Sequence, residues 1–365
     1  MSYGIKSPAK YVQGNGELAN LGRNAKKMGE KFLVLCSANN KKRVGDAIEE
    51  SLKSVEKEVV FCEVNGECSK AEIARVMEVV TETGCDVVIG VGGGKVIDTA
   101  KAVVTNLGGY PLIIIPTVAS NDSPCSGVAV IYNEEGVVIK ALLMKRNPDL
   151  VLVDTAVIAK SPKRLLVAGM GDALATWFEA RACKNSGAKT MARGLCSNTA
   201  LMMSKLCYDI LIRDGAKALE ALEAKEPNDA LDNVVEACIY LSGVGFESGG
   251  LAVAHAINDG FAYVPQAHGM YHGEKVAFGT LAQLVLEKAS EDEMNQVLAF
   301  MKDVGLPMTL ADLGITDVKE DEIRKVAEAA CVPTQSTKNL RKDITADEVY
   351  AAIMEADKIG TAYKA

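Results

Sequence analysis

The 365-residue sequence lacks the features that mark several large classes of protein. Its ten cysteines are scattered singly with no CxxC pair, so we expect buried thiols in a reducing cytoplasm rather than disulfides or a cysteine-rich zinc site. No run of 18 apolar residues is present, and the N-terminus resembles no secretory signal, which argues against a membrane protein. A formal net charge of -8 leaves no basic surface for nucleic acid or anionic lipid.

Histidine is also rare. The three histidines of the chain, His255, His268 and His272, all lie within one 18-residue window. Histidine is the commonest metal ligand and the commonest side chain for proton transfer near neutral pH. The cluster therefore predicts a functional site, with structural histidines at helix ends as the alternative.

A chain of this length is too long for one ordinary core and is expected to form two domains. In residues 1–160, short apolar runs alternate with helical patterns, which predicts an α/β domain with a doubly wound parallel sheet. The expected strands are residues 31–36, 58–63, 86–91, 111–116 and 150–153. Residues 127–145 are predicted to form a hairpin at the edge of that sheet, with its turn at residues 133–136.

From residue 161 onward, apolar residues recur at the three- and four-residue spacing of amphipathic helices. The expected helices are residues 162–182, 187–213, 228–246, 270–304, 319–332 and 346–358. Strand signals are nearly absent, so residues 161–365 are predicted to form an all-α domain. No long linker separates the two halves, and we expect the domains to pack together with a ligand cleft between them.

A run of glycines joins the predicted strand at 86–91 to the helix that follows it. In GVGGGKVIDTAKAV, Gly93 and Gly94 allow the backbone to approach an anion closely, and the amides of a helix N-terminus attract negative charge. The run is neither the usual dinucleotide fingerprint nor a Walker loop, because Lys95 replaces a glycine and Val96 replaces a magnesium-binding Ser or Thr. A phosphate site is favoured, with a tight structural turn as the alternative.

The next predicted strand ends in the polar loop of IIIPTVASNDSPCSG. Open α/β sheets bind ligands at the carboxyl ends of their strands. The short hydrogen-bonding side chains of this loop are Thr117, Ser120, Asn121, Asp122, Ser123 and Ser126. An ordinary surface loop would have a similar composition, so both interpretations stay open here.

Seven motifs resemble the glycerol dehydrogenase family of the iron-containing (group III) alcohol dehydrogenases. They are SPAKYVQG, GVGGGKVIDTAKAV, IPTVASNDSPCS, NPDLVLVDT, GMGDALATWFEARA, YLSGVGFESGGLAVAHAINDG and HGEKVAFGTL. The resemblance as a whole covers the chain from about Ser7 to Lys364. The resemblance implies a Rossmann-like NAD-binding domain and a helical metal-binding domain, an architecture shared with dehydroquinate synthase. It also implies zinc-dependent oxidation of glycerol to dihydroxyacetone in a homo-oligomer such as an octamer.

Matched by motif, the resemblance implies that Asp172, His255 and His272 bind zinc and, through it, the substrate. Thr176 stands where the wider superfamily often has a histidine, which fits a three-ligand site with an open position. The cofactor phosphates would lie on Gly93, Gly94 and Lys95. Positions associated with the dinucleotide or its nicotinamide end are Asp98, Thr117, Ser120, Ser126, Val128 and Tyr132.

The implied chemistry uses these residues directly. A zinc ion held by one carboxylate and two neutral imidazoles keeps a positive charge, which lowers the pKa of an alcohol before hydride passes to nicotinamide. Asp122 matches the substrate-contacting aspartate of the family and would accept a hydrogen bond from a substrate hydroxyl. His268 lies four residues before His272, and on a helix both would share a face. The sequence leaves two roles possible for His268, a proton relay and a structural histidine.

Three departures from the family pattern leave the cofactor and the substrate undecided. Ser37 replaces an aspartate that would contact the adenosine ribose, so NADP is an alternative to NAD. Asn258 and Gly269 replace histidines, and Asp259 brings a carboxylate near the metal. Lys338 replaces a later histidine. Another small diol or hydroxyketone such as 1,2-propanediol is the close alternative substrate, followed by a dehydroquinate synthase-like lyase and a binding protein without turnover.

Overall fold

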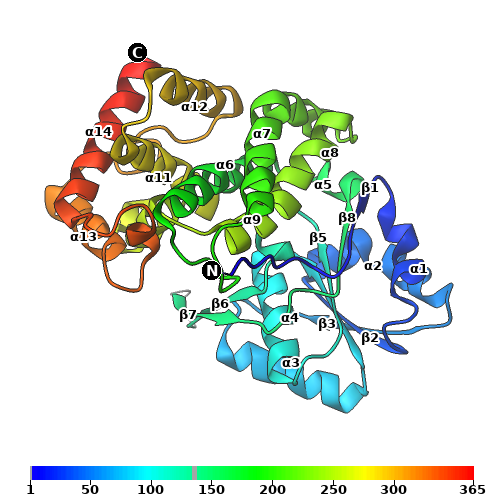
Figure 1. Ribbon diagram of the computed structural model, residues 1–365. Coiled ribbons are helices and arrows are strands. Elements are labelled where there is room, and N and C mark those ends of the chain that lie inside the picture. Colours follow the sequence, from blue (N-terminus) through cyan, green and yellow to red (C-terminus); the bar gives the residue numbers. More distant parts are fainter. Residues whose placement is uncertain (1, 134–137) are drawn as a thin grey trace. The chain divides into compact units, whose positions relative to one another are not determined.

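The structure is a computed structural model that describes residues 2–133 and 138–365 (Figure 1). The chain forms two compact units. The α/β unit comprises Lys6–Pro162 and Ala221–Gly243, and the helical unit comprises Met1–Ile5, Lys163–Glu220 and Val244–Ala365.

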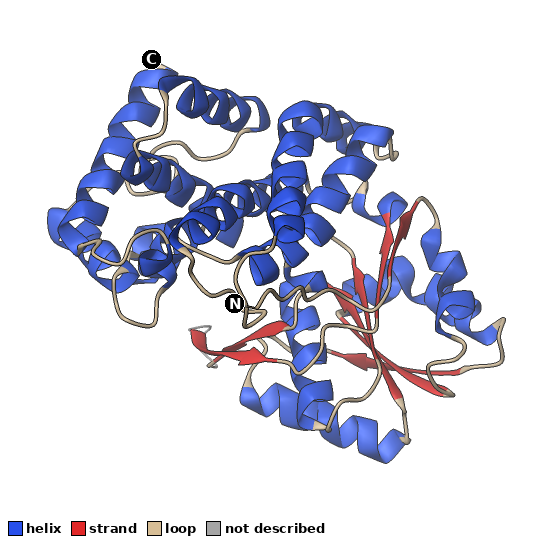
Figure 2. Ribbon diagram, viewed as in Figure 1, coloured by secondary structure: helices blue, strands red, loops and turns tan. Residues whose placement is uncertain are grey.

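Six parallel strands, among those drawn red in Figure 2, form the sheet of the α/β unit. Their order is β1-β8-β5-β4-β2-β3. They are β1 (Tyr11–Gly14), β2 (Lys31–Cys36), β3 (Glu58–Glu63), β4 (Val87–Gly92), β5 (Leu112–Pro116) and β8 (Leu150–Asp154). The predicted parallel α/β fold is confirmed, and all five predicted strands are present. The strand that the sequence did not predict, β1, is half-buried and has no apolar run.

Helices cover both faces of this sheet, which is why its central strands are apolar on both sides. The helices of this unit are α1 (Leu21–Ala25), α2 (Ala38–Lys53), α3 (Lys70–Thr83), α4 (Gly94–Asn106), α5 (Thr155–Ile158) and α8 (Asp229–Glu236), followed by a π-helix (Ala237–Leu241). Leu21 of α1 and Ile48 of α2 share a core with Val34 of β2. On the other face, a Cβ at Gly90 would lie 2.8 Å from Ala100 Cβ, so glycine lets α4 approach β4 closely.

The predicted hairpin is present, but its predicted position is wrong. Its strands β6 (Val128–Tyr132) and β7 (Val138–Leu143) pair antiparallel in a separate two-stranded sheet, whereas β1 and β3 are the edges of the main sheet. Two backbone groups of β6 bond to residues that are not in the main sheet. Val128 O accepts from Lys101 Nζ of α4, and the Tyr132 amide donates to Cys68 O. Apart from Asn133, the residues of the predicted turn lie outside the described residues.

The helical unit is built from eight helices, partly shared with the α/β unit at α7 and α9. They are α6 (Lys163–Ser186), α7 (Asn198–Ala224), α9 (Ser242–Gly249), α10 (Val253–Gly260), α11 (His272–Glu287), α12 (Glu291–Val304), α13 (Glu320–Ala330) and α14 (Ala346–Lys364). The helical character predicted for this half is confirmed. The expected helix at 270–304 is two helices, because Lys288 adopts a left-handed conformation (φ 53°) and Ser290 caps α12. The short α10 was not predicted.

Glycines bring three of these helices into close contact. A Cβ at Gly273, at the start of α11, would lie 1.8 Å from the carbonyl oxygen of Ala168 in α6. A Cβ at Gly279, further along α11, would lie 2.5 Å from the carbonyl oxygen of Ala254 in α10. The absence of a side chain at these two positions therefore allows α11 to lie directly against both α6 and α10.

Two compositional expectations can be compared with the structure. All ten cysteines are free, and nine are buried, as expected for scattered apolar thiols. Across the described parts of the chain, no single helix is long and apolar enough to cross a membrane. One bent pair, Asp229–Gly249 with Val253–Tyr263, reaches the required length and composition.

Candidate active site

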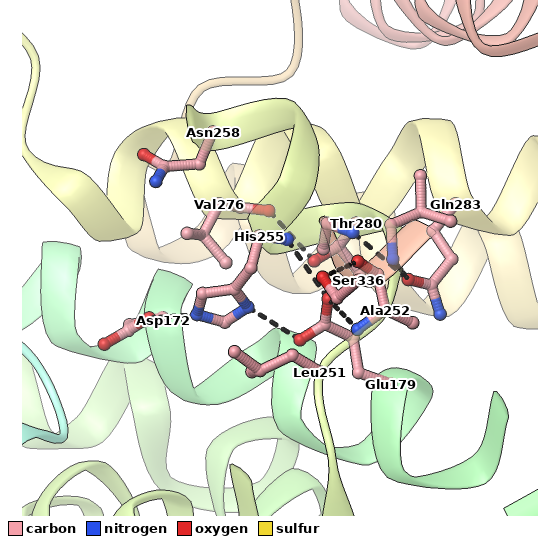
Figure 3. A network of polar contacts seen from close by, with 12 residues as sticks. Asp172, Glu179, Leu251, Ala252, His255, Asn258, Val276, Thr280, Gln283 and Ser336 are labelled. Carbon is pink, nitrogen blue, oxygen red and sulfur yellow. Dashed lines mark hydrogen bonds and ion pairs between the residues drawn. The ribbon is translucent and has the colours of Figure 1, made fainter. Parts of the chain in front are cut away.

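Within the helical unit, Asp172 of α6, His255 of α10 and His272 of α11 come together. Asp172 Oδ1 lies 3.3 Å from His255 Nε2 and 3.2 Å from His272 Nε2. One ligand atom from each residue lies within 4.8 Å of the other two, a geometry that could hold a single metal ion. Figure 3 shows the imidazole of His255 directed toward Asp172.

The local sequence explains how two of these side chains meet. Asp172 follows Gly171 in α6, and His272 precedes Gly273 at the start of α11. A Cβ at Gly171 would lie 2.4 Å from the carbonyl oxygen of Gly273, so the two helices touch at the residues next to the ligands. Asp172 is buried, whereas 44% of the His272 side chain is exposed. His272 is therefore the member of the cluster that is most open to solvent.

The charges around the cluster set the protonation of its members. Burial acts to raise the pKa of Asp172, but His272 and His255 together hold it well below its usual range. Burial acts to lower the pKa of His255, but the carboxylates of Glu179 and Asp172 raise it well above its usual value. A metal ion would therefore have to displace a proton from His255, while Asp172 is already ionised.

Glu179 is a partner of His255 that sequence reasoning missed. Its Oε2 lies 2.6 Å from His255 Nδ1, the ring nitrogen that faces away from Asp172, and its side chain is fully buried. Glu179 follows Asp172 by seven residues, or two helical turns, so both side chains project from the same face of α6. An acidic residue two helical turns from a ligand, within the largely apolar middle of α6, is the signal that could have identified it.

Two further acidic or polar positions lie outside the cluster. Buried Thr176 faces α9, where a Cβ at Gly245 would lie 2.5 Å from Thr176 Cγ2. Asp259 accepts hydrogen bonds from Asn258 Nδ2 at 3.1 Å and Gln335 Nε2 at 3.0 Å. Neither belongs to the three-residue group found among the described residues.

His268 is not aligned with His272 on a common helix, because α11 begins at His272. It lies after a short 3-10 helix and is exposed, with Nε2 2.9 Å from the carbonyl oxygen of Ala262. His268 and His272 therefore do not share a helical face, because only His272 belongs to α11. A proton-relay role for His268 stays a prediction.

In the α/β unit, predicted cofactor residues follow the carboxyl ends of neighbouring strands. Ser37 comes directly after β2, Gly93 after β4 and Thr117 after β5. Parallel strands end at the same edge of their sheet, so these positions share the edge at which open α/β sheets bind ligands. Gly93 is the N-cap of α4 and Gly94 its first residue, which gives the predicted order of strand, glycine and helix.

Two of the predicted cofactor-binding side chains, Lys95 and Ser37, already contact other residues of the protein. The Lys95 ammonium pairs with Glu67. Ser37 is the N-cap of α2, and its Oγ accepts from the Asn40 amide at 3.2 Å. An anion at the start of α4 would therefore be held first by backbone amides, with Lys95 joining only after it leaves Glu67.

A buried lysine organises the second polar loop. Lys101 is fully buried, and its Nζ donates to Ser126 Oγ at 3.1 Å, to Val128 O at 2.8 Å and to Ser123 O. Asp98 lies one turn earlier on α4, where burial raises its pKa to about 6 against the opposing effect of Lys101. Two predicted cofactor residues, Ser126 and Val128, thus accept hydrogen bonds from a buried lysine that sequence reasoning missed, and the charge of this lysine also acts on Asp98.

The remaining predicted residues lie around the same loop and hairpin. Thr117 is buried, while Ser120 and Tyr132 are partly exposed. Asp122 is buried, and its Oδ2 accepts from Ser242 Oγ at 2.8 Å within the α/β unit. Its carboxylate is thereby held in a defined orientation.

Comparisons with known proteins identify the family of this chain. Residues 8–155 match the family model "Iron-containing alcohol dehydrogenase". The chain is 48% identical over 359 residues to glycerol dehydrogenase from Escherichia coli O6:H1, covering 98% of this chain and 97% of that protein. It is 39% identical to glycolaldehyde reductase from Halobacterium salinarum, covering 98% and 97%. The solved structure of glycerol dehydrogenase from Schizosaccharomyces pombe superposes with a TM-score of 0.95 at 35% identity, covering 100% of this chain and 92% of that one.

These matches define the class: the chain is an oxidoreductase of the iron-containing alcohol dehydrogenases, a family that implies a nicotinamide cofactor and a metal. Within that class it belongs to the glycerol dehydrogenase family, as the sequence motifs predicted.

Proposed function

We propose that this protein oxidises glycerol to dihydroxyacetone, with zinc at Asp172, His255 and His272 and NAD as the hydride acceptor. The observation that carries the proposal is the convergence of these three side chains from three helices. Its support from outside the chain is the similarity to glycerol dehydrogenases over nearly the whole length. We further expect a cytoplasmic homo-oligomer.

The donor set fits the proposed metal. One carboxylate and two imidazoles are ligands that zinc accepts, and three protein ligands leave one coordination position for a substrate. When bound, zinc would supply positive charge that lowers the pKa of an alcohol, and NAD would accept the hydride. Asp172 would neutralise part of the metal charge, and Asp122, oriented by Ser242, would accept a hydrogen bond from a substrate hydroxyl.

The proposed cofactor site uses the start of α4, where the amides after Gly93 would hold the pyrophosphate. NADP is the second candidate, because Ser37 offers no carboxylate to repel a 2′-phosphate. The Ser37 hydroxyl is also engaged as a helix cap, so its preference for either cofactor would be small.

A second candidate substrate is a small hydroxyaldehyde or another diol. The observation that favours it is the loss of two family histidines, at Asn258 and Gly269. Gly269 is exposed, and among the described residues other than its chain neighbours no atom lies within 4 Å of the place where a Cβ would be, so a histidine side chain would fit at this position. The similarity to a glycolaldehyde reductase supports the same alternative.

We expect the purified protein to reduce NAD in the presence of glycerol, and to lose this activity when the metal is removed by a chelator. Zinc should restore it, because no residue of the cluster can replace the charge of the ion. The measurement is the absorbance of reduced cofactor with NAD and with NADP, across glycerol, 1,2-propanediol and glycolaldehyde. Full activity in protein shown by elemental analysis to be metal-free would contradict the proposal.

Zinc affinity is expected to rise with pH through and beyond the ordinary histidine pKa of 6.5. Because the pKa of His255 lies well above that value, a proton competes with zinc at neutral pH, and zinc uptake should release it. Asp172 is ionised throughout this range and adds no pH dependence. Zinc titrations of the metal-free protein between pH 6 and 9 measure the effect, and an affinity that is constant above pH 6.5 would contradict it.

A further inference from the structure

The N-terminus of α10, the helix that carries His255, has no capping side chain of its own. The N-cap position is Ala252, whose side chain accepts no hydrogen bond. The first amides of an α-helix have no partner within the helix, and leaving them buried and unbonded costs free energy. Ala252, Val253 and Ala254 are all buried, so these amides need partners from elsewhere in the protein.

Two buried side chains from the neighbouring helices supply those partners (Figure 3). Glu179 Oε1, from α6, accepts from the amides of Ala252 at 2.8 Å and His255 at 3.1 Å. Gln283 Oε1, from α11, accepts from the amides of Val253 at 3.0 Å and Ala254 at 3.2 Å. All four amides are thereby satisfied by the two helices that also provide the other metal ligands.

The orientation of both capping side chains is itself determined. Gln283 Nε2 donates to Glu287 Oε1 at 2.8 Å, so its oxygen must face α10. Glu179 uses its second oxygen, Oε2, to accept from His255 Nδ1 at 2.6 Å. When a metal displaces the proton that His255 carries on Nε2, the proton on Nδ1 stays with Glu179. The Nε2 lone pair is then free on the side of the ring that faces Asp172, which is the form of histidine that binds a metal.

We propose that Glu179 and Gln283 are positioning residues that place His255 in its ligand geometry before a metal binds. Together they locate the backbone of α10 relative to α6 and α11, and Glu179 alone keeps the His255 proton on Nδ1. The inference rests on the proposed metal site but not on turnover. It adds two residues, neither of which contacts the metal, to those that determine zinc affinity.

The variant Glu179→Gln separates the two roles of Glu179. Its amide oxygen can still accept from the backbone of α10, but its NH2 group would face His255 Nδ1 and favour the proton on Nε2. At a pH where His255 is neutral in both proteins, we expect the dissociation constant for zinc to rise about 10- to 100-fold, while the unfolding midpoint of the metal-free protein stays close to that of the wild type. Glu293→Gln is the matched control, because it removes a carboxylate from the same unit that contacts Arg181 instead. The inference is wrong if Glu179→Gln binds zinc within about twofold of the wild type.

Two further measurements do not depend on how that variant folds. With only three histidines in the chain, ¹⁵N labelling of histidine resolves each ring. At a pH high enough for the His255 ring to be neutral, its single proton should lie on Nδ1 in the metal-free wild type. An unprotonated Nδ1 there would overturn the role of Glu179. Gln283→Ala should lower the unfolding midpoint of the metal-free protein and also weaken zinc binding, and a zinc affinity within about twofold of the wild type would overturn its positioning role. A wild type that binds zinc without oxidising glycerol would instead refute only the proposed function.

Discussion

Replacement of Asp172 by Asn is expected to weaken zinc binding by more than about a hundredfold, because losing a residue that only hydrogen-bonds to a metal ligand already costs up to that factor. Asp172 is the only anionic member of the three-residue group, and its Oδ1 is the point at which both imidazoles converge. We expect glycerol-dependent reduction of NAD to fall in parallel, to below about 1% of the wild type at limiting zinc. Zinc titration of the metal-free protein and cofactor absorbance measure the two effects.

Asp209→Asn is the matched control for this variant. Asp209 lies on α7 of the helical unit, is exposed and pairs with Lys205, so the same chemical change there should alter neither zinc affinity nor activity. An Asp172→Asn protein that retains more than about a tenth of the wild-type zinc affinity would refute the assignment of Asp172 as a ligand.

Gly273→Ala is expected to destabilise the protein by more than about 3 kcal/mol, the upper end of ordinary overpacking. The new Cβ would lie 1.8 Å from the carbonyl oxygen of Ala168, and backbone at that distance cannot yield without α6 and α11 moving apart. Asp172 and His272 sit beside this contact, so their ligand atoms would separate as well. Displacements of about 1 Å in such sites cost about a hundredfold in rate. Denaturant unfolding of the metal-free protein and zinc titration test both consequences.

Gly269→Ala provides a control only four residues away. No atom lies within 4 Å of the position of its Cβ, and the residue is not among the glycines with positive φ. Its replacement should change the free energy of unfolding by no more than about 0.5 kcal/mol. Equal destabilisation by the two substitutions would show that the helix contact at Gly273 has no special role.

Secondary structure was predictable from sequence where burial imposes a continuous pattern. The strands β2, β4 and β5 are covered by helices on both faces, so they appear as unbroken apolar runs. Half-buried β1 lacks such a run and was missed. The hairpin was recognised from its two strands, but its separation from the main sheet depends on hydrogen bonds to Lys101 and Cys68, which no local pattern reveals.

The candidate metal site was predicted through motifs, not through spacing. His255 and His272 attract attention because histidine is rare, but Asp172 lies 83 residues before His255 and only its resemblance to the family motif identified it. Glu179 was not identified, although it lies in the same motif. Its role depends on contacts with α10, a helix that the sequence did not predict.

The sequence by itself determined the parallel α/β fold and the helical character of the second half, because both follow from local periodicity. It also determined the three candidate ligands, because short motifs contain them. Only the tertiary structure decided how those ligands converge, since the close contacts at Gly171, Gly273 and Gly279 are properties of helix pairs. The tertiary structure alone also showed that Glu179 and Gln283 complete the hydrogen bonds of α10. Backbone amides at a helix N-terminus must find partners, and in this protein those partners lie 73 and 30 residues away in sequence.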